Sequence, residues 1–166
     1  MNSLFKRFGD SPPSDADLYR AVREWADDAC VSRYSILNFL LSNGDVMVAG
    51  SWPGARPGST CWNGLHYVVR EAPFATAHLS DIDFQVDFAK ETTSSDRVAV
   101  IATYPLTDNE RWREFESREL LLFRDGRPFV PREDGRGLRA RDYKHRGGGY
   151  DGKRAPQFVD SGDMMI

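Results

Sequence analysis

The feature that most constrains the fold of this chain is a succession of short β-type segments between residues 35 and 130, separated by turn residues. Residues 35–52 contain two apolar stretches joined by Asn43–Gly44, and residues 119–130 contain two joined by Asp125–Gly126. Both dipeptides tolerate the positive φ angles of tight turns, so each pair of stretches is predicted to form a β-hairpin, the first through a type I′ turn. Further strands are predicted at residues 65–70, 75–80, 82–88 and 97–106.

One amphipathic helix is predicted ahead of these strands. In residues 11–31 the apolar side chains recur at spacings of three and four, which is the period of one helix face. Ser14 can cap the first turn, and Asp17 three residues later suits a capping box and the positive end of the helix dipole. Trp25 lies in the apolar stripe, so we expect it to be buried and Trp25→Ala to cost about 3 to 5 kcal/mol. A helix followed by antiparallel strands predicts the α+β class.

Two segments stand outside this pattern. Thr107 and Glu110 have capping-box spacing, which predicts a short helical turn over residues 107–115. From Pro131 onward the apolar periodicity is lost and Gly and Arg dominate, which predicts a mobile tail or a segment that wraps the surface. We therefore expect a folded domain at residues 1–130 and a Gly/Arg-rich tail at residues 131–166.

Charge and composition exclude some classes of binding partner. Residues 131–154 hold eight Lys and Arg against four Asp and Glu, whereas residues 1–130 hold 14 against 19 and so form an acidic body. An acidic body argues against nucleic acid as the main partner, because neutralising phosphates needs a basic face. No apolar run approaches the roughly 18 residues of a membrane span, and two cysteines are too few for a disulfide framework. We expect a cytoplasmic protein with no membrane partner and with reduced thiols.

The three histidines and four tryptophans are candidate site residues by their side-chain chemistry. His66 and His78 could act as general acid or base near neutral pH, but their spacing indicates no carboxylate or thiol partner, so we expect half-buried strand histidines. His145 is expected to be solvated in the tail. The tryptophans are not interleaved with Lys and Arg as in readers of single-stranded nucleic acid, so packing is expected for Trp25, Trp52, Trp62 and Trp112.

An acidic cluster raises the question of a metal site. Asp81, Asp83 and Asp87 could gather carboxylates, but no loop typical of an EF-hand follows. We interpret them as the solvent-exposed face of an edge strand. The opposite face, expected to point into a sheet sandwich, would then hold Ile82, Phe84, Val86 and Phe88.

Five segments in a fixed order resemble one known family. They are NFLLSNG (38–44), LHYVVREAPF (65–74), DIDFQVDF (81–88), RVAVIATYPLTDNERW (97–112) and ELLLFRDGRP (119–128). Together, over about residues 15–130, they resemble the second half of the small stand-alone class II glutamine amidotransferases of bacteria. The resemblance implies part of an αββα N-terminal-nucleophile hydrolase sandwich, in which two antiparallel sheets stack between helical layers. It also implies glutamine as the substrate of intact relatives.

The resemblance implies a reaction that this chain lacks the residues to perform. In the family, an N-terminal cysteine attacks the glutamine amide and its free α-amine relays the proton. Here Asn2 follows Met1, and Cys30 and Cys61 lie inside the chain with their nitrogens in amide bonds. The family's oxyanion Asn-Gly pair lies upstream of the matching region, so Asn43–Gly44 and Asn63–Gly64 are interpreted as turns. We assign no catalytic, cofactor-binding or metal-binding residue and expect no cofactor.

Two hypotheses follow from these observations. The first is an amidotransferase whose front portion is missing through truncation, a late start site or a split gene, and which is inactive alone. The alternative is a non-catalytic half-domain that a complementing or identical partner chain completes across an exposed sheet edge. A nucleic-acid accessory role through the basic tail is the weakest interpretation, since its binding would be weak and sensitive to salt.

Overall fold

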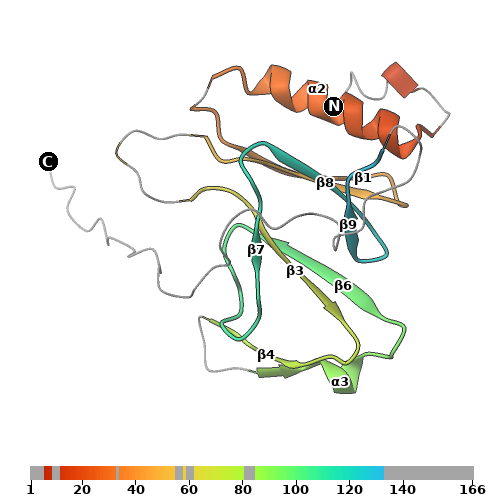
Figure 1. Cartoon of the computed structure of the whole chain (residues 1–166), viewed down its shortest axis with the longest axis vertical. Helices are drawn as coiled ribbons and strands as arrows, with labels where there is room; N and C mark the ends of the chain where they lie inside the picture. Colours follow the sequence, from red (N-terminus) through yellow and green to blue (C-terminus); the bar gives the residue numbers. More distant parts are fainter. Residues whose placement is uncertain are drawn as a thin grey trace, which may run out of the picture.

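The computed structural model describes residues 6–8, 12–32, 34–54, 58, 62–80 and 85–132. Figure 1 shows the elements and their labels. In chain order they are α2 (Asp15–Ala29), β1 (Leu37–Ser42), β2 (Met47–Trp52), β3 (His66–Glu71), β4 (Thr76–His78), β5 (Gln85–Asp87), α3 (Phe88–Glu91), β6 (Arg97–Ala102), β7 (Arg113–Glu114), β8 (Glu119–Arg124) and β9 (Arg127–Phe129). No described helix has the length and apolar character needed to cross a membrane.

Helix α2 begins where the sequence predicts. The Ser14 side chain accepts a hydrogen bond from the backbone N–H of Asp17 at 3.2 Å, which satisfies one of the free amides of the first turn. Val22 and Ala26 are fully buried on the apolar face. Trp25 is only half-buried at the flank of that face, where its ring meets Phe39 edge-on. The expected burial of Trp25 is therefore confirmed in part, since the side chain packs against the core without being fully buried, and Trp25→Ala should cost less than a full core truncation.

The two predicted hairpins form, but with different turns. Strands β8 and β9 are joined by Asp125 and Gly126, which both have positive φ, as a type I′ turn requires. Strands β1 and β2 are joined by four residues, 43–46, and of these only Gly44 has positive φ. The predicted type I′ turn at Asn43–Gly44 is wrong, because the Asn43 carboxamide oxygen accepts from the N–H groups of Asp45 and Val46 and holds a longer loop.

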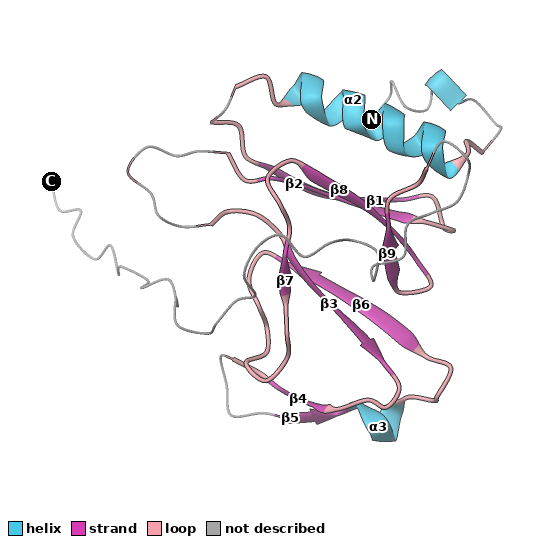
Figure 2. Cartoon of the chain, in the orientation of Figure 1, coloured by secondary structure: helices cyan, strands magenta, loops and turns pink. Residues whose placement is uncertain are grey.

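Three antiparallel sheets arrange the strands, shown in magenta in Figure 2. The four-stranded sheet, here sheet A, has the order β1-β2-β8-β9, and the three-stranded sheet, here sheet B, has the order β6-β3-β7. Strands β4 and β5 form a separate pair. The strand predicted over residues 82–88 is confirmed in its described part as β5, but it ends before Phe88, because Asp87 caps α3 by accepting from the Ala89 N–H. Ile82 and Phe84 lie outside the described residues.

The predicted helical turn over residues 107–115 does not form. The described backbone there begins with an isolated bridge between Thr107 and Leu79 and continues through bends to the short strand β7. Thr107 and Glu110 do contact each other, but through their side chains. The Glu110 carboxylate is also held by Arg70, and the Asp108 N–H donates to the carbonyl oxygen of His78 at 3.2 Å. These tertiary contacts replace the local helix.

The core consists of two apolar layers, one on each face of sheet A. Helix α2 covers one face, and sheet B packs against part of the other, so the order of layers is helix, sheet, sheet (Figure 1). The buried members of the helix-side layer are Val22, Ala26, Cys30, Val46, Val48, Trp52, Leu120 and Leu122. Those of the layer between the sheets are Ala49, Leu65, Tyr67, Phe115, Leu121 and Phe123. The α+β class with antiparallel strands is confirmed.

Candidate functional site

Cys30 is a structural thiol. It caps the C-terminal end of α2, and its N–H donates to the carbonyl oxygens of Ala26 and Asp27. Its side chain is buried in the helix-side layer. Burial raises the pKa of the Cys30 thiol, and the nearby Arg118 only partly opposes this. A buried, protonated thiol is a weak nucleophile. Cys61 lies outside the described residues.

The two Asn-Gly pairs lie in loops. Asn43 and Gly44 form the β1–β2 loop described above. The Asn63 carbonyl oxygen accepts from the Asn38 side-chain amide at 2.7 Å. Gly64 lies so close to Trp62 that a Cβ there would be 2.5 Å from the indole ring. Asn63–Gly64 therefore packs against neighbouring residues, whereas Asn43–Gly44 shapes the β1–β2 loop.

His66 is buried on the face of sheet B that points away from sheet A. Burial lowers the pKa of His66, against the opposing effect of a backbone hydrogen bond with Thr103. Its Nε2 lies 3.7 Å from Glu114 Oε2, directly across the β3–β7 pair. Burial raises the pKa of the Glu114 carboxyl. Both shifts favour the neutral forms and so act against an ion pair between His66 and Glu114.

His78 has a carboxylate partner that sequence spacing did not indicate. Its Nδ1 lies 2.9 Å from both carboxylate oxygens of Asp108. Asn109 fixes the same strand by accepting from the His78 N–H and donating to the Thr76 carbonyl oxygen. A carboxylate at Nδ1 orients an imidazole as in general-base sites. The partners stand 30 residues apart, so only the pairing of β4 with the 105–109 segment reveals them.

A mostly buried polar cluster joins β3 to the 107–112 segment. Arg70 donates two hydrogen bonds to Glu110, at 2.7 and 2.6 Å, and its guanidinium lies 4.4 Å from the Phe88 ring centroid. Trp112 donates to the Thr107 hydroxyl at 2.8 Å, and that hydroxyl donates to Glu110. Burial acts to raise the pKa of Glu110, but the hydrogen bonds from Arg70 and Thr107 outweigh it and lower the pKa. The geometry is that of a structural clamp.

The predicted acidic cluster and the tryptophans do not gather into a site among the described residues. Asp87 caps α3, while Asp81 and Asp83 lie outside the described range. No group of three or more metal-ligating side chains occurs in the part of the chain that the structure describes. Trp52 and Trp112 are buried, and Trp52 stacks on Phe39. His145 and the Gly/Arg-rich segment also lie outside, so the division at residue 130 stays a prediction.

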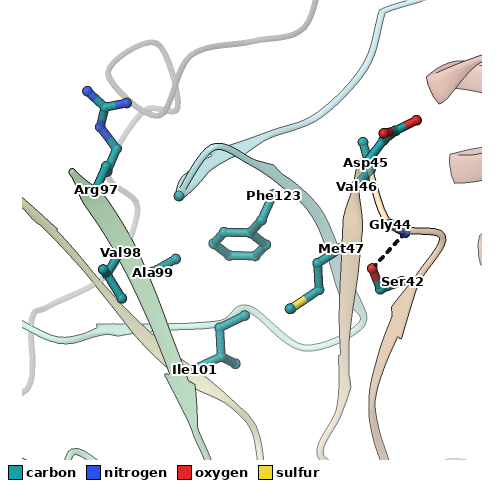
Figure 3. A pocket seen from close by; sticks show the side chains of 11 residues that line it. Ser42, Gly44, Asp45, Val46, Met47, Arg97, Val98, Ala99, Ile101 and Phe123 are labelled. Carbon is teal, nitrogen blue, oxygen red and sulfur yellow. Dashed lines mark hydrogen bonds between the residues drawn. The ribbon is translucent and has the colours of Figure 1, made fainter. Parts of the chain in front are cut away.

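One cavity of about 330 Å³ lies between β6 and the β1–β2 hairpin. Figure 3 shows Met47 and Phe123 on one side and Ala99 and Ile101 of β6 on the other. Asp45 and Arg97 are the charged residues in its lining. The cavity holds no histidine or cysteine, and its walls are mainly apolar. Its mainly apolar walls can accept an apolar side chain.

A family model and two curated relatives match this chain. The model of the glutamine amidotransferases class-II matches residues 1–141. A provisionally named glutamine amidotransferase of Haemophilus influenzae is 34% identical over 114 residues, which cover 69% of this chain and 35% of that protein. The provisionally named glutamine amidotransferase YafJ of Escherichia coli is 34% identical over 123 residues, which cover 74% of this chain and 44% of that protein.

A solved structure agrees with the sequence matches. The crystal structure of a predicted glutamine amidotransferase from Pseudomonas aeruginosa superposes with a TM-score of 0.55 at 34% identity. The match covers 74% of this chain and 44% of that protein. The chain thus spans less than half the length of these relatives.

Proposed function

The chain belongs to the class II glutamine amidotransferases, and from this premise we propose that it forms the part of a glutamine-hydrolysing domain that holds no nucleophile. The substrate of the complete domain is glutamine, whose side-chain amide is hydrolysed by an N-terminal cysteine. The 166-residue chain is inactive alone and needs the rest of the domain for turnover. We propose that the protein lies in the cytoplasm, because its two cysteines are too few for a disulfide framework.

The state of Cys30 carries this proposal. Attack on an amide requires a thiolate with an adjacent base, and in this family the base is the α-amine of the same residue. Cys30 has a buried thiol with a raised pKa and a backbone N–H committed to the end of α2. Cys61 also lies within the chain, so its nitrogen is an amide. Neither residue can combine the two groups that the reaction needs.

The fold proposed for the complete domain is the N-terminal-nucleophile hydrolase sandwich. Its support is the order of layers, in which α2 lies on sheet A and sheet A stacks on sheet B. That order supplies a helical layer and two antiparallel sheets of the αββα arrangement. The second helical layer would cover the face of sheet B that holds His66 and Val68.

The test is a glutaminase assay on the chain with and without the missing part of the domain. The 166-residue chain is incubated with glutamine, and glutamate release is measured. We expect no release above that of the heat-denatured chain, and release when the unmatched part of the P. aeruginosa protein is added as a second polypeptide. Turnover by the chain alone that disappears in Cys61→Ser or Cys30→Ser would overturn the proposal.

A second candidate function is a non-catalytic half-domain that binds a partner chain. The observation that favours it is the exposure of Leu40 and Met47 on a face of sheet A that otherwise packs against sheet B. A complex that forms with the added polypeptide but releases no glutamate would support this candidate over hydrolysis.

A further inference from the structure

The cavity between β6 and β2 touches the outer edge of sheet B. Its lining includes the consecutive residues Arg97, Val98 and Ala99, whose side chains point to alternate faces of β6. A cavity that meets both faces of a strand lies at its edge. No residue of β3, the neighbour of β6 in sheet B, lines the cavity. The cavity therefore opens beside the edge of β6 that faces away from β3.

That edge of β6 is unpaired among the described strands. Strand β6 is the terminal strand of sheet B and pairs in register with β3 along its whole length, from Arg97 opposite Glu71 to Ala102 opposite His66. Its first residue, Arg97, lies against the turn at Gly126, and the side chains of Ala99 and Ile101 pack toward the layer between the sheets. Unpaired N–H and C=O groups on a strand edge are a template for another strand.

Apolar side chains stand exposed on both sides of this edge. Met47 lines the cavity from sheet A and is 38% exposed, and Val98 lines it from β6 and is 44% exposed. Leu40 is 50% exposed. Phe39 and Leu41 pack on the α2 side, so Leu40 lies on the opposite face, the face that includes Met47. A strand added to β6, about 4.8 Å beyond it, would place alternate side chains against this face of sheet A.

The length of the relatives indicates what covers this surface. This chain spans only 35% and 44% of the two curated relatives, so more than half of each lies outside the match. A second copy of the chain would repeat the matched part of these relatives and not the unmatched part. Residues 131–154 are also a poor occupant, because their eight Lys and Arg residues and Gly-rich composition lack the apolar alternation of a strand.

We propose that the free edge of β6, together with Met47 and Leu40, is the docking surface for a β-strand from the part of a class II amidotransferase domain that this chain does not match. The proposal rests on the proposed function, since it names the surface through which that function is completed. The added strand pairs its backbone with β6 and places apolar side chains in the cavity. Sheet B thereby extends across the exposed part of sheet A.

The test titrates the unmatched part of the P. aeruginosa protein into the 166-residue chain by isothermal calorimetry. We expect binding with a dissociation constant on the order of 1 µM. Met47→Asp should weaken binding by about tenfold or more, because it brings a charge into an apolar contact. Val31→Asp is the matched control, since Val31 is 87% exposed beyond the end of α2 and away from the cavity. It should leave the affinity unchanged.

Hydrogen exchange separates strand addition from mere side-chain contact. Amides of residues 98–102 should exchange about tenfold more slowly in the complex. Unchanged exchange there, equal binding by Met47→Asp, or no binding at about 100 µM would each overturn the proposal. So would a dimer of the chain alone that Met47→Asp dissolves, or β6 protection that is lost when residues 133–166 are deleted.

The glutaminase assay on the same mixture keeps the two proposals apart. Protection of β6 in a complex without glutamate release would retain the docking surface and remove hydrolysis as the function. Glutamate release without protection of β6 would retain the function and remove this surface.

Discussion

The two faces of sheet A differ in how completely this chain covers them. On the α2 face, Val22 and Leu122 are fully buried. On the opposite face, Leu121 and Phe123 are buried by sheet B, but Leu40 is half exposed and Met47 lies at an open cavity. The sheet presents leucines on both faces, yet in the described part of the chain only the α2 face is covered across all four strands.

This difference indicates which face of sheet A contributes to the stability of the chain and which is open to association. The helix-side layer consists of described residues of this chain that pack against one another. The layer between the sheets stops where sheet B ends at β6. If the two faces differ in this way, substitutions on the α2 face should unfold the chain, whereas substitutions near β6 should affect association more than folding.

The strongest test compares leucines on the two faces. Leu122→Ala should lower the free energy of unfolding by about 3 to 5 kcal/mol, because it leaves a cavity in a fully buried layer. Leu40→Ala removes the same atoms from a half-exposed site and should cost less than about 1 kcal/mol. Urea denaturation followed by circular dichroism measures both. Equal losses would mean that the two faces are covered to the same extent.

A smaller effect is expected at the polar clamp that ties β3 to the 107–112 segment. Glu110→Gln removes the charge that Arg70 binds twice and should cost about 2 kcal/mol. The folded-state pKa of Glu110 is lowered, so its contribution is present above the ordinary glutamate value of 4.5 and is lost as the pH falls through the lower folded value. Denaturation of both proteins at several pH values should show their difference shrinking in acid. A constant difference would contradict the clamp.

The cap of α2 should contribute less. Ser14→Ala removes the acceptor for the Asp17 N–H and should cost about 1 kcal/mol. Ser14→Asp, which keeps an acceptor at the helix end, is the matched control and should retain most of the stability. Thermal denaturation of the two variants measures the difference. If Ser14→Ala melts like the native chain, the helix-side layer does not depend on this cap.

The smallest effect is expected at the cavity. Met47→Asp in the isolated chain should change the free energy of unfolding by about 0.5 kcal/mol, because the Met47 side chain is partly exposed and lines an open cavity. Chemical denaturation checks this value. A loss as large as that of Leu122→Ala would show that the cavity side is a closed core.

Local sequence patterns predicted the helix and strands themselves better than the contacts that each of them makes with distant segments. The stripe and cap of α2 and the Asp125–Gly126 turn depend on residues a few positions apart, and the structure confirms them. The turn at Asn43–Gly44 failed because a side-chain carboxamide two to three residues away accepted the loop amides. The predicted helix over residues 107–115 failed for a different reason, since its capping glutamate is held by Arg70, 40 residues earlier in the chain.

The surroundings of His78 and Trp25 likewise depend on tertiary contacts that the local sequence does not show. Sequence spacing gave His78 no partner, because Asp108 reaches it only through the pairing of β4 with a distant loop. Trp25 was expected to be buried since it shares the helix stripe, but the position of α2 on sheet A leaves it at the flank. Burial depends on what lies opposite, and that information is absent from a local pattern.

The sequence by itself determined the α+β class, the antiparallel strands, the family and the internal position of both cysteines, because these follow from short-range periodicity, turn residues and ordered motifs. The tertiary structure alone decided that Cys30 is a buried thiol with a raised pKa, that Arg70 and Glu110 form a clamp, and that β6 ends sheet B beside an open apolar cavity. These features depend on distances between segments that lie far apart along the chain, and such distances are fixed only when the layers pack.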